Sequence, residues 1–303
     1  MSAGLRVGLD IGGTKMLGVI VAADGAVVAQ AREATVAGPD GVLATATTVL
    51  DRLAAALDGA LPPHIGIGFP GLVDHDRGAV SHAVNLGLDG DWLPLADRLA
   101  ERTGAAVAVE NDVRAATWGA HVLSGADDLG YLSIGTGLAA GFVLGGRLRR
   151  GAQGASGEIG HVPVDPDGPL CSCGQRGCLE RSAAASALTA AWPTDGAMSP
   201  AVALFAAAAA GDPAAIAIRD RFCGRVADAI RMLGLSVDPA AIILGGGITD
   251  LGEPLLAAIT GALRAQAATS PFLAAINLAD RVRLLPAGVP AAAIGAAMIW
   301  DAR

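Results

Sequence analysis

The sequence predicts an α/β protein with two related lobes, and two observations favour this fold class. Short apolar strands alternate with stretches whose apolar residues recur at three and four positions, the spacing of a half-buried helix. A strand that runs into a glycine turn and a hairpin occurs at 6–22 and again at 131–148. No low-complexity linker separates the halves, so we expect a hinge between lobes that share a cleft. The expected lobes are 1–112 with 290–303, and 113–289.

The elements of the first half follow from its apolar runs and from the turns that close them. Asp24-Gly25 is a hairpin signal, and Pro70-Gly71 ends the run before it. Residues 73–94 are rich in Gly, Asp, His and Asn, and we expect a loop there. The assignment has strands at 6–11, 16–22, 27–29, 65–69 and 107–110, and helices at 41–57 and 95–102.

The second half opens by repeating the first. Leu132-Ser133-Ile134-Gly135 matches Leu9-Asp10-Ile11-Gly12, and each leads into a hairpin with a two-residue turn. The pattern indicates a duplicated architecture, and the alternative is coincidence between two ordinary hairpins. The remaining assignment has strands at 131–137, 140–144, 147–148, 241–244 and 282–285, and helices at 201–210, 213–233, 251–268 and 291–302.

Composition excludes several classes of function. The 303 residues are 52% apolar and 17% charged, which is ample for a large core. A net charge of -8 without a basic run argues against a nucleic-acid binder, and 3% aromatic residues are few for base stacking. Neither a signal-peptide pattern nor an unbroken apolar stretch of spanning length occurs. We therefore expect a soluble, cytoplasmic protein with no nucleic-acid or membrane partner.

The first glycine turn carries chemistry suited to phosphate. Gly12 and Gly13 let backbone N–H groups approach phosphate oxygens closely, and Thr14 adds a hydroxyl. Lys15 is the single lysine of the chain, and Asp10 offers a carboxylate suited to hydrated Mg²⁺. The spacing differs from a Walker A loop. The alternative is a strand-to-hairpin turn that binds no ligand.

Two further glycine turns follow strands. Gly135-Thr136-Gly137 can hold phosphates in the same manner, and Gly246 lies in a run of three glycines that lets a flat adenosine approach the backbone. Each turn alone is weak support for a ligand. Three such turns at strand ends, one of which carries Asp and Lys, favour a nucleotide site.

A carboxylate suited to proton transfer follows the strand at 107–110. Asp112 at a strand end in a cleft is a natural general base for an attacking hydroxyl. Asn111 beside it has both a donor and an acceptor for a neighbouring hydroxyl. The alternative is that Asn111-Asp112 only caps the next helix, a frequent use of these residues.

Three of the four cysteines fall within eight residues. Cys171, Cys173 and Cys178, with His161 shortly upstream, supply three thiolates and one imidazole for a closed tetrahedral Zn²⁺ site. A closed site leaves no metal-bound water, so the metal would be structural. The alternative is a disulfide, which a cytoplasmic chain disfavours and which leaves an odd cysteine. Cys223, on a helical stretch, is expected to be buried.

Two glutamates flank this cysteine cluster. Glu158 lies three residues before His161, and Glu180 lies two residues after Cys178. A metal that fixes the loop would place both carboxylates as acceptors for sugar hydroxyls. The alternative is that both are ordinary surface charges.

These stretches together resemble the ROK family of sugar kinases and repressors, within the actin-like ATPase superfamily. The resemblance covers nearly the whole chain in the family's order, at 9–15, 68–71, 110–112, 135–141, 151–161, 171–180 and 245–247. It implies two actin-like, ribonuclease-H-like lobes with a nucleotide and sugar cleft between them. It also implies phosphorylation of a hexose hydroxyl by MgATP, most simply glucose to glucose 6-phosphate, and a homodimer or homotetramer.

The resemblance also assigns roles to residues. Asp112 corresponds to the family's catalytic base. The sugar contacts are Asn111, Asp112, Glu158, His161 and Glu180, and the zinc ligands are His161, Cys171, Cys173 and Cys178. His161 would serve zinc and sugar through its two ring nitrogens. The nucleotide and Mg²⁺ site comprises Asp10, Gly12, Gly13, Thr14, Lys15, Gly135, Thr136, Gly137 and Gly246.

Two departures from the family pattern leave the substrates open. Leu138-Ala139-Ala140 stands where the family often has glycines, which leaves ATP or polyphosphate as the donor, and the loop 85–92 near the sugar is longer than expected. N-acetylglucosamine, N-acetylmannosamine and other hexoses stay open beside glucose. The family's repressors need a helix-turn-helix ahead of Asp10, for which nine residues give no room. A non-catalytic sugar sensor would lack the base or the phosphate turn, and both are present.

Overall fold

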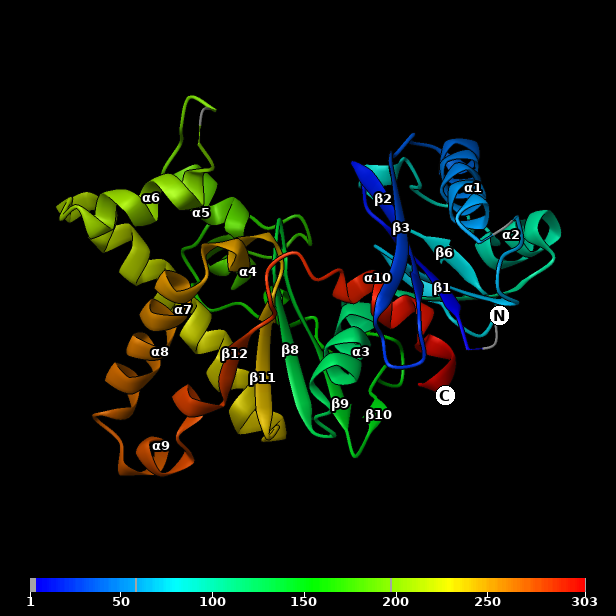
Figure 1. The fold of residues 1–303 in the computed structure, drawn as a ribbon. Helices are drawn as coiled ribbons and strands as arrows, with labels where there is room; N and C mark the ends of the chain where they lie inside the picture. Colours follow the sequence, from blue (N-terminus) through cyan, green and yellow to red (C-terminus); the bar gives the residue numbers. More distant parts are fainter. Residues whose placement is uncertain (1–3, 58, 197, 303) are drawn as a thin grey trace. The chain divides into compact units, whose positions relative to one another are not determined.

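The computed structural model describes residues 4–57, 59–196 and 198–302, which form two compact units (Figure 1). Unit 1 contains the chain up to Asp127, the segment 143–154 and the segment from Pro290 onward. Unit 2 contains residues 128–142 and 155–289. The mixture of sheets and helices confirms the predicted α/β class.

Unit 1 is built on a five-stranded sheet with the order β3-β2-β1-β4-β7. β1 pairs antiparallel with β2 and parallel with β4, and β4 pairs parallel with β7. The strands are β1 Arg6–Ile11, β2 Lys15–Val21, β3 Val27–Ala34, β4 His64–Phe69 and β7 Ala106–Asn111. The carboxyl ends of β1, β4 and β7 therefore meet at one edge of the sheet.

Helices cover both faces of this sheet, α1 and α2 on one face and α3 and α10 on the other (Figure 1). Alternate residues of β1 divide between the faces: Val7 and Leu9 pack in the core that α1 and α2 share. On the other face a Cβ on Gly8 would lie 1.9 Å from the carbonyl oxygen of Ala293, so α10 lies directly on the strand. The helices are α1 Pro39–Ala55, α2 Leu95–Thr103, α3 Asp112–Ser124 and α10 Ala291–Ala297.

This packing shifts the lobe boundary from the expected one at Asp112. A Cβ on Gly119 of α3 would lie 2.0 Å from the carbonyl oxygen of Ala291, and one on Gly295 of α10 would lie 1.8 Å from that of Ala115. Because glycine lets the two helices approach to backbone contact, α3 belongs with α10 in unit 1.

The second sheet has the order β10-β9-β8-β11-β12. Its strands are β8 Leu129–Ile134, β9 Leu138–Leu144, β10 Arg147–Leu148, β11 Ala241–Gly245 and β12 Val282–Leu284. β8 and β12 pair parallel with β11, and β10 pairs antiparallel with β9, so the order repeats that of the first sheet strand for strand. The predicted duplication is confirmed. The end of β9 and β10 group with unit 1, and the rest of the sheet with unit 2.

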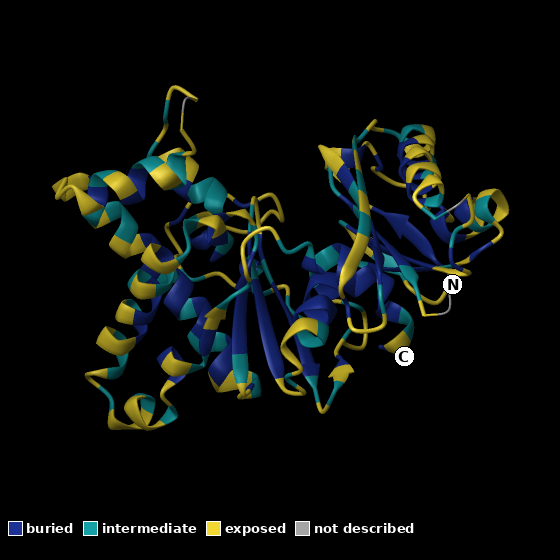
Figure 2. Cartoon of the chain, in the orientation of Figure 1, coloured by how far each residue is buried: buried dark blue, intermediate teal, exposed yellow. Residues whose placement is uncertain are grey.

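Helices make up most of the rest of unit 2. They are α4 Glu180–Ala183, α5 Ala185–Ala191, α6 Pro200–Ala209, α7 Pro213–Val237, α8 Glu253–Ala267 and α9 Pro271–Ile276, with 3-10 turns η2 Ile159–His161, η3 Gly247–Leu251 and η4 Leu278–Arg281. The central strands of each sheet are buried, whereas the edge strand β3 and the outer helix faces are largely exposed (Figure 2). Among the described residues no single helix is long and apolar enough to cross a membrane; only α6 and α7 taken together, bent by 118°, meet that test of length and composition.

Two regions differ from the prediction. The expected loop at 73–94 contains a small sheet of β5 Leu72–Asp74 and β6 Ala79–Ser81, and the 3-10 turn η1 Val84–Leu86. These elements are too short for periodicity to reveal. The last helix, expected to reach residue 302, ends at Ala297 and continues as the 3-10 turn η5 Ile299–Asp301.

Candidate active site

The predicted catalytic residues of unit 1 lie at the carboxyl edge of its sheet. In the strand register Asp10 of β1 lies beside Gly68 of β4, and Gly68 lies beside Glu110 of β7. Asn111 and Asp112 follow directly after Glu110. Parallel strands therefore bring Asp10 and Asp112, which are far apart in sequence, to the same edge.

Asn111 caps the helix that Asp112 begins. The Asn111 side-chain oxygen accepts hydrogen bonds from the backbone N–H groups of Val113 at 3.1 Å and Arg114 at 3.2 Å. The capping alternative is thus correct for Asn111, and it engages the amide oxygen that the sequence assigned to a sugar hydroxyl. The amide nitrogen Nδ2 is the atom of Asn111 left to such a contact.

Asp112 is the first residue of α3, and its Oδ1 accepts a hydrogen bond from the N–H of Val113 at 2.9 Å. A Cβ on Gly68 would lie 3.6 Å from the Cα of Asp112 and 3.3 Å from the Cβ of Ala115. The first of these distances is an ordinary van der Waals contact and the second is slightly tight, so the start of α3 packs directly on the strand edge at Gly68.

The carboxylates of Asp10 and Asp112 interact electrostatically. Burial, and next the negative charge of Asp112, raises the pKa of Asp10 to about 6, and the nearby Lys15 ammonium only partly opposes this. Two carboxylates that destabilise one another's charge are relieved by a cation between them. This edge therefore suits a hydrated divalent ion, which prefers carboxylate and water oxygens.

The first glycine turn is held in shape by hydrogen bonds. Gly12 donates its N–H to the carbonyl of Lys15 at 3.0 Å, and the Thr35 hydroxyl donates to the carbonyl of Gly12 at 2.7 Å. A Cβ on Gly13 would lie 2.9 Å from the Cβ of Asn85. The loop 85–92 therefore packs against the turn. Asn85 has no local sequence signal for this contact, which depends on the fold.

In unit 2 the other two glycine turns lie side by side. A Cβ on Gly246, whose φ is +91°, would lie 2.4 Å from the carbonyl oxygen of Ile134, the residue before Gly135. Gly135 donates its N–H to the carbonyl of Gly137 at 3.0 Å. The ends of β8 and β11 therefore present two glycine turns at one edge, as the sequence predicted for a nucleotide.

Glu180 contacts the second of these turns. Its Oε2 accepts the N–H of Leu138 at 3.0 Å, and a Cβ on Gly137 would lie 2.6 Å from the same oxygen. A Cβ on Gly160 would lie 3.4 Å from the Cβ of Glu180. The segment with Glu158 and His161 thus lies against both Glu180 and the turn, so the predicted sugar contacts of unit 2 gather in one place.

The four predicted metal ligands also converge. The ligand atoms of His161, Cys171, Cys173 and Cys178 all lie within 4.8 Å of one another. Cys173 Sγ is 3.6 Å from Cys178 Sγ, and Cys171 Sγ is 3.7 Å from His161 Nδ1. Tetrahedral zinc with ordinary Zn–S and Zn–N bonds separates its ligand atoms by roughly 3.5–3.8 Å. The residues therefore fit a zinc ion, and none of the four cysteines forms a disulfide.

The two nitrogens of His161 face different partners. Nδ1 faces the cysteine cluster, and Nε2 lies 3.9 Å from Oε2 of Glu158. A metal held through Nδ1 would fix the ring and leave Nε2 beside a carboxylate. Cys223 lies apart in α7 and is buried, as expected, and burial raises the pKa of its thiol to about 12.

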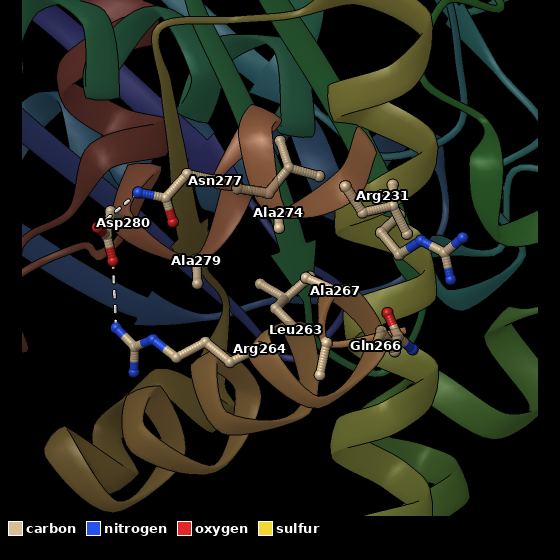
Figure 3. Close-up of a pocket in the computed structure, with 12 residues that line it drawn as sticks. Arg231, Leu263, Arg264, Gln266, Ala267, Ala274, Asn277, Ala279 and Asp280 are labelled. Atoms are coloured by element: carbon tan, nitrogen blue, oxygen red, sulfur yellow. Dashed lines mark hydrogen bonds and ion pairs between the residues drawn. The ribbon is translucent and has the colours of Figure 1, made fainter. Parts of the chain in front are cut away.

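A cavity elsewhere in unit 2 is separate from these residues. It has a volume of about 310 Å³ and lies among α7, α8, α9 and η4, with Leu263, Ala267 and Ala274 between Arg231 at one end and the Arg264–Asp280 ion pair at the other (Figure 3). None of the predicted site residues lines it. The predicted site residues of unit 1 lie at the carboxyl edge of its sheet, and those of unit 2 lie at its two glycine turns and around the cysteine cluster.

Comparisons with known proteins agree with these motifs. The model of the ROK family matches residues 6–303. The chain is 36% identical to a glucokinase of Thermotoga maritima, covering 82% of this chain and 84% of that protein, and 31% identical to an N-acetylmannosamine kinase of Yersinia pseudotuberculosis, covering 81% and 83%.

Among solved structures, a ROK family glucokinase from Streptomyces griseus in complex with glucose and AMPPNP has a TM-score of 0.79 and 32% identity, covering 98% of this chain and 99% of that one. This likeness confirms the predicted actin-like fold. Matched by the family model over nearly its whole length and similar to relatives at 36% and 31% identity, the chain belongs to the ROK family.

Proposed function

We propose that this protein is a sugar kinase, a phosphotransferase that moves the γ-phosphoryl group of MgATP to the 6-hydroxyl of glucose. The observation that carries the proposal is the pair of interacting carboxylates, Asp10 and Asp112, at one sheet edge beside a glycine turn. The similarity to glucokinases supports glucose as the acceptor.

Asp112 is the proposed base. It takes the proton of the 6-hydroxyl as that oxygen forms a bond to the γ-phosphorus, while the bond from that phosphorus to the bridging oxygen breaks and ADP leaves with the electron pair. Proton removal contributes about 10²–10⁴-fold, and positioning supplies most of the remainder. Asp112 lies at the start of α3, which packs directly on the strand edge at Gly68.

Each unit carries residues proposed for the nucleotide. In unit 1, Gly12, Gly13, Thr14 and Lys15 hold phosphate oxygens, and Asp10 holds the Mg²⁺ of the nucleotide through water. In unit 2, Gly135, Thr136 and Gly137 hold phosphates and Gly246 faces the adenosine. The geometry within each unit supports these roles, since each set lies at the carboxyl end of a strand.

The sugar is proposed to contact Nδ2 of Asn111, the carboxylates of Glu158 and Glu180, and Nε2 of His161. A zinc ion on His161, Cys171, Cys173 and Cys178 would brace this segment, because it links residues of two neighbouring loops. Glu180 fastens the same segment to the second glycine turn through Leu138.

We also propose, on the family resemblance, a cytoplasmic homodimer or homotetramer. Phosphorylation of N-acetylmannosamine is the second candidate, because a kinase for that sugar is 31% identical to this chain. The loop 85–92, which packs on Gly13 through Asn85, is the region where such a difference in acceptor would arise.

A coupled assay of the purified protein tests the proposal. We expect phosphorylation of glucose in a panel that includes N-acetylmannosamine and N-acetylglucosamine, with MgATP or polyphosphate as donor. Asp112→Asn should retain sugar binding and lose about 10²–10⁴-fold in kcat. Asp51→Asn, an exposed position on α1, is the matched control and should keep full activity. Turnover of no sugar in the panel, or near-normal kcat for Asp112→Asn, contradicts the proposal.

A further inference from the structure

A fully buried carboxylate, Glu110, lies two residues before the proposed base Asp112. Glu110 has 0% exposure, and both of its oxygens are engaged. Oε1 accepts from Arg114 Nε at 2.6 Å, and Oε2 accepts from Arg150 Nε at 2.6 Å. Burial opposes ionisation, yet the two guanidinium groups outweigh it and lower the pKa of Glu110. The group is therefore a buried anion between two cations.

Stability alone is a weak reason for such an arrangement. Removing two or three charges from water costs about as much as their attraction returns, and apolar residues of similar volume often do as well. The three side chains are held in fixed geometry all the same. Arg114 is 5% exposed, and its Nη1 donates to the carbonyl of Gly154 at 2.7 Å.

The bonds of Glu110 fix the backbone on both sides of Asp112. On one side Oε1 accepts the backbone N–H of Asn111 at 2.9 Å. On the other side Arg114, in the first turn of α3, reaches back to the same oxygen. The Glu110 carboxylate thereby fixes the residues on either side of Asp112, and so the position of Asp112 itself.

The same group of side chains also holds one of the two segments through which the chain leaves unit 1. This crossing lies between Gly154 and Ala155, and Glu158 follows three residues after Ala155. Gly154 and Gly157 have φ of +71° and +95°, conformations that glycine adopts without strain. Arg150 and the carbonyl of Gly154 thus tie the unit 1 end of this segment to Glu110.

We propose that Glu110, Arg114 and Arg150 form a positioning clamp that holds the Asp112 carboxylate for proton transfer and anchors the segment leading to Glu158 and His161. None of the three is assigned a contact with substrate. Their effect on kcat is through Asp112, and their effect on glucose KM is through the segment that leads to Glu158 and His161. The inference rests on the proposed function, in which Asp112 is the base.

Arg150→Met tests the clamp because it removes the guanidinium group and keeps an unbranched apolar stem. We expect kcat to fall on the order of 10–100-fold, since a small displacement of a reacting group has that effect. KM for MgATP should change by less than about twofold, because the phosphate turns are untouched. Arg150→Lys, which keeps one charged donor, should recover most of the loss.

Arg149→Met is the matched control. Arg149 is the exposed neighbour, and its Nη2 donates to the carbonyl of Leu144 at 3.0 Å. The Arg149→Met variant should keep the wild-type kcat and KM values. Circular dichroism and melting curves check that each variant is folded at the assay temperature, and if Arg150→Met is unfolded there, all variants are compared at a lower temperature at which it is folded.

The decisive experiment places Arg150→Met in the Asp112→Asn background. If the clamp acts through the base, its removal causes no further loss of the residual phosphoryl transfer. A loss that multiplies with that of Asp112→Asn, or an unchanged kcat for Arg150→Met alone, overturns the clamp. Full activity of Asp112→Asn alone overturns the base assignment instead, so the two failures are distinguishable.

Discussion

Asp10 and Asp112 share one edge of the first sheet, and the charge of Asp112 adds to burial in raising the pKa of Asp10 to about 6. The pair is electrostatically unfavourable in the absence of a cation. In the proposed mechanism this edge serves the Mg²⁺ of the nucleotide and the base, and the proposal therefore implies a site that sacrifices stability for function.

Asp10→Asn is therefore expected to stabilise the ligand-free protein while it removes activity. The native state holds the Asp10 proton up to about pH 6, whereas the unfolded chain releases it near the ordinary value of 3.8. Stability from this group is present below about pH 4 and is lost as pH rises through about 6. At pH 7.5, without nucleotide or Mg²⁺, the variant should gain up to about 3 kcal/mol in urea unfolding.

The pH dependence separates this cause from a general effect. Between about pH 4 and pH 6 the gain of Asp10→Asn over wild type should grow, and it should level off above that range. Asp51→Asn on α1 should follow wild type throughout. A variant that is less stable than wild type at every pH would show that the Asp10 carboxylate is not under electrostatic strain.

Much of the fold was predictable because its signals are local. Apolar runs and glycine turns define each strand. The repeated strand-turn-hairpin pattern predicted a duplicated architecture, and the two sheets share a common strand order. The cysteine cluster was predictable for the same reason, since three of its four ligands lie within eight residues.

What sequence could not provide are contacts between remote segments. Arg150 reaches Glu110 across forty residues of chain, and Asn85 packs on Gly13; neither position has an unusual neighbourhood in the sequence. The two uses of Asn111-Asp112, as helix cap and as catalytic pair, were both expected as alternatives. The structure combines the cap on Asn111 with a carboxylate at the first position of α3.

The cysteine cluster leads to a prediction about metal. The purified protein should contain about one zinc per chain, because one tetrahedral set of ligands is present among the described residues. Chelation should lower the melting temperature and weaken glucose binding together, because the proposed sugar contact Glu180 lies two residues after the metal ligand Cys178.

Cys171→Ser should lose the metal, and Cys223→Ala is its control. Cys223 is buried in α7 away from the cluster, so its variant should keep the zinc even where packing lowers stability. Metal analysis by mass spectrometry and isothermal titration with glucose measure both outcomes. Unchanged zinc content in Cys171→Ser would contradict the assigned ligands.

The third glycine turn offers a test of the nucleotide side. At Gly246 the backbone has a φ of +91°, and a Cβ would lie 2.4 Å from the carbonyl oxygen of Ile134, which is backbone and cannot swing away. Gly246→Ala should therefore push β11 and β8 apart at the two glycine turns and destabilise the fold by about 1–3 kcal/mol. KM for ATP should rise about tenfold or more, which corresponds to a loss of about 1.4 kcal/mol in nucleotide binding. KM for glucose should change less.

Gly224→Ala in α7, where a Cβ meets nothing within 4 Å, is the control. It should gain about 0.5–1 kcal/mol in stability from helix propensity, with unchanged kinetics. Steady-state kinetics with ATP and glucose varied in turn measure the two KM values. If Gly246→Ala raises KM for glucose alone, the assignment of Gly246 to the nucleotide is wrong and Gly246 belongs with the sugar contacts.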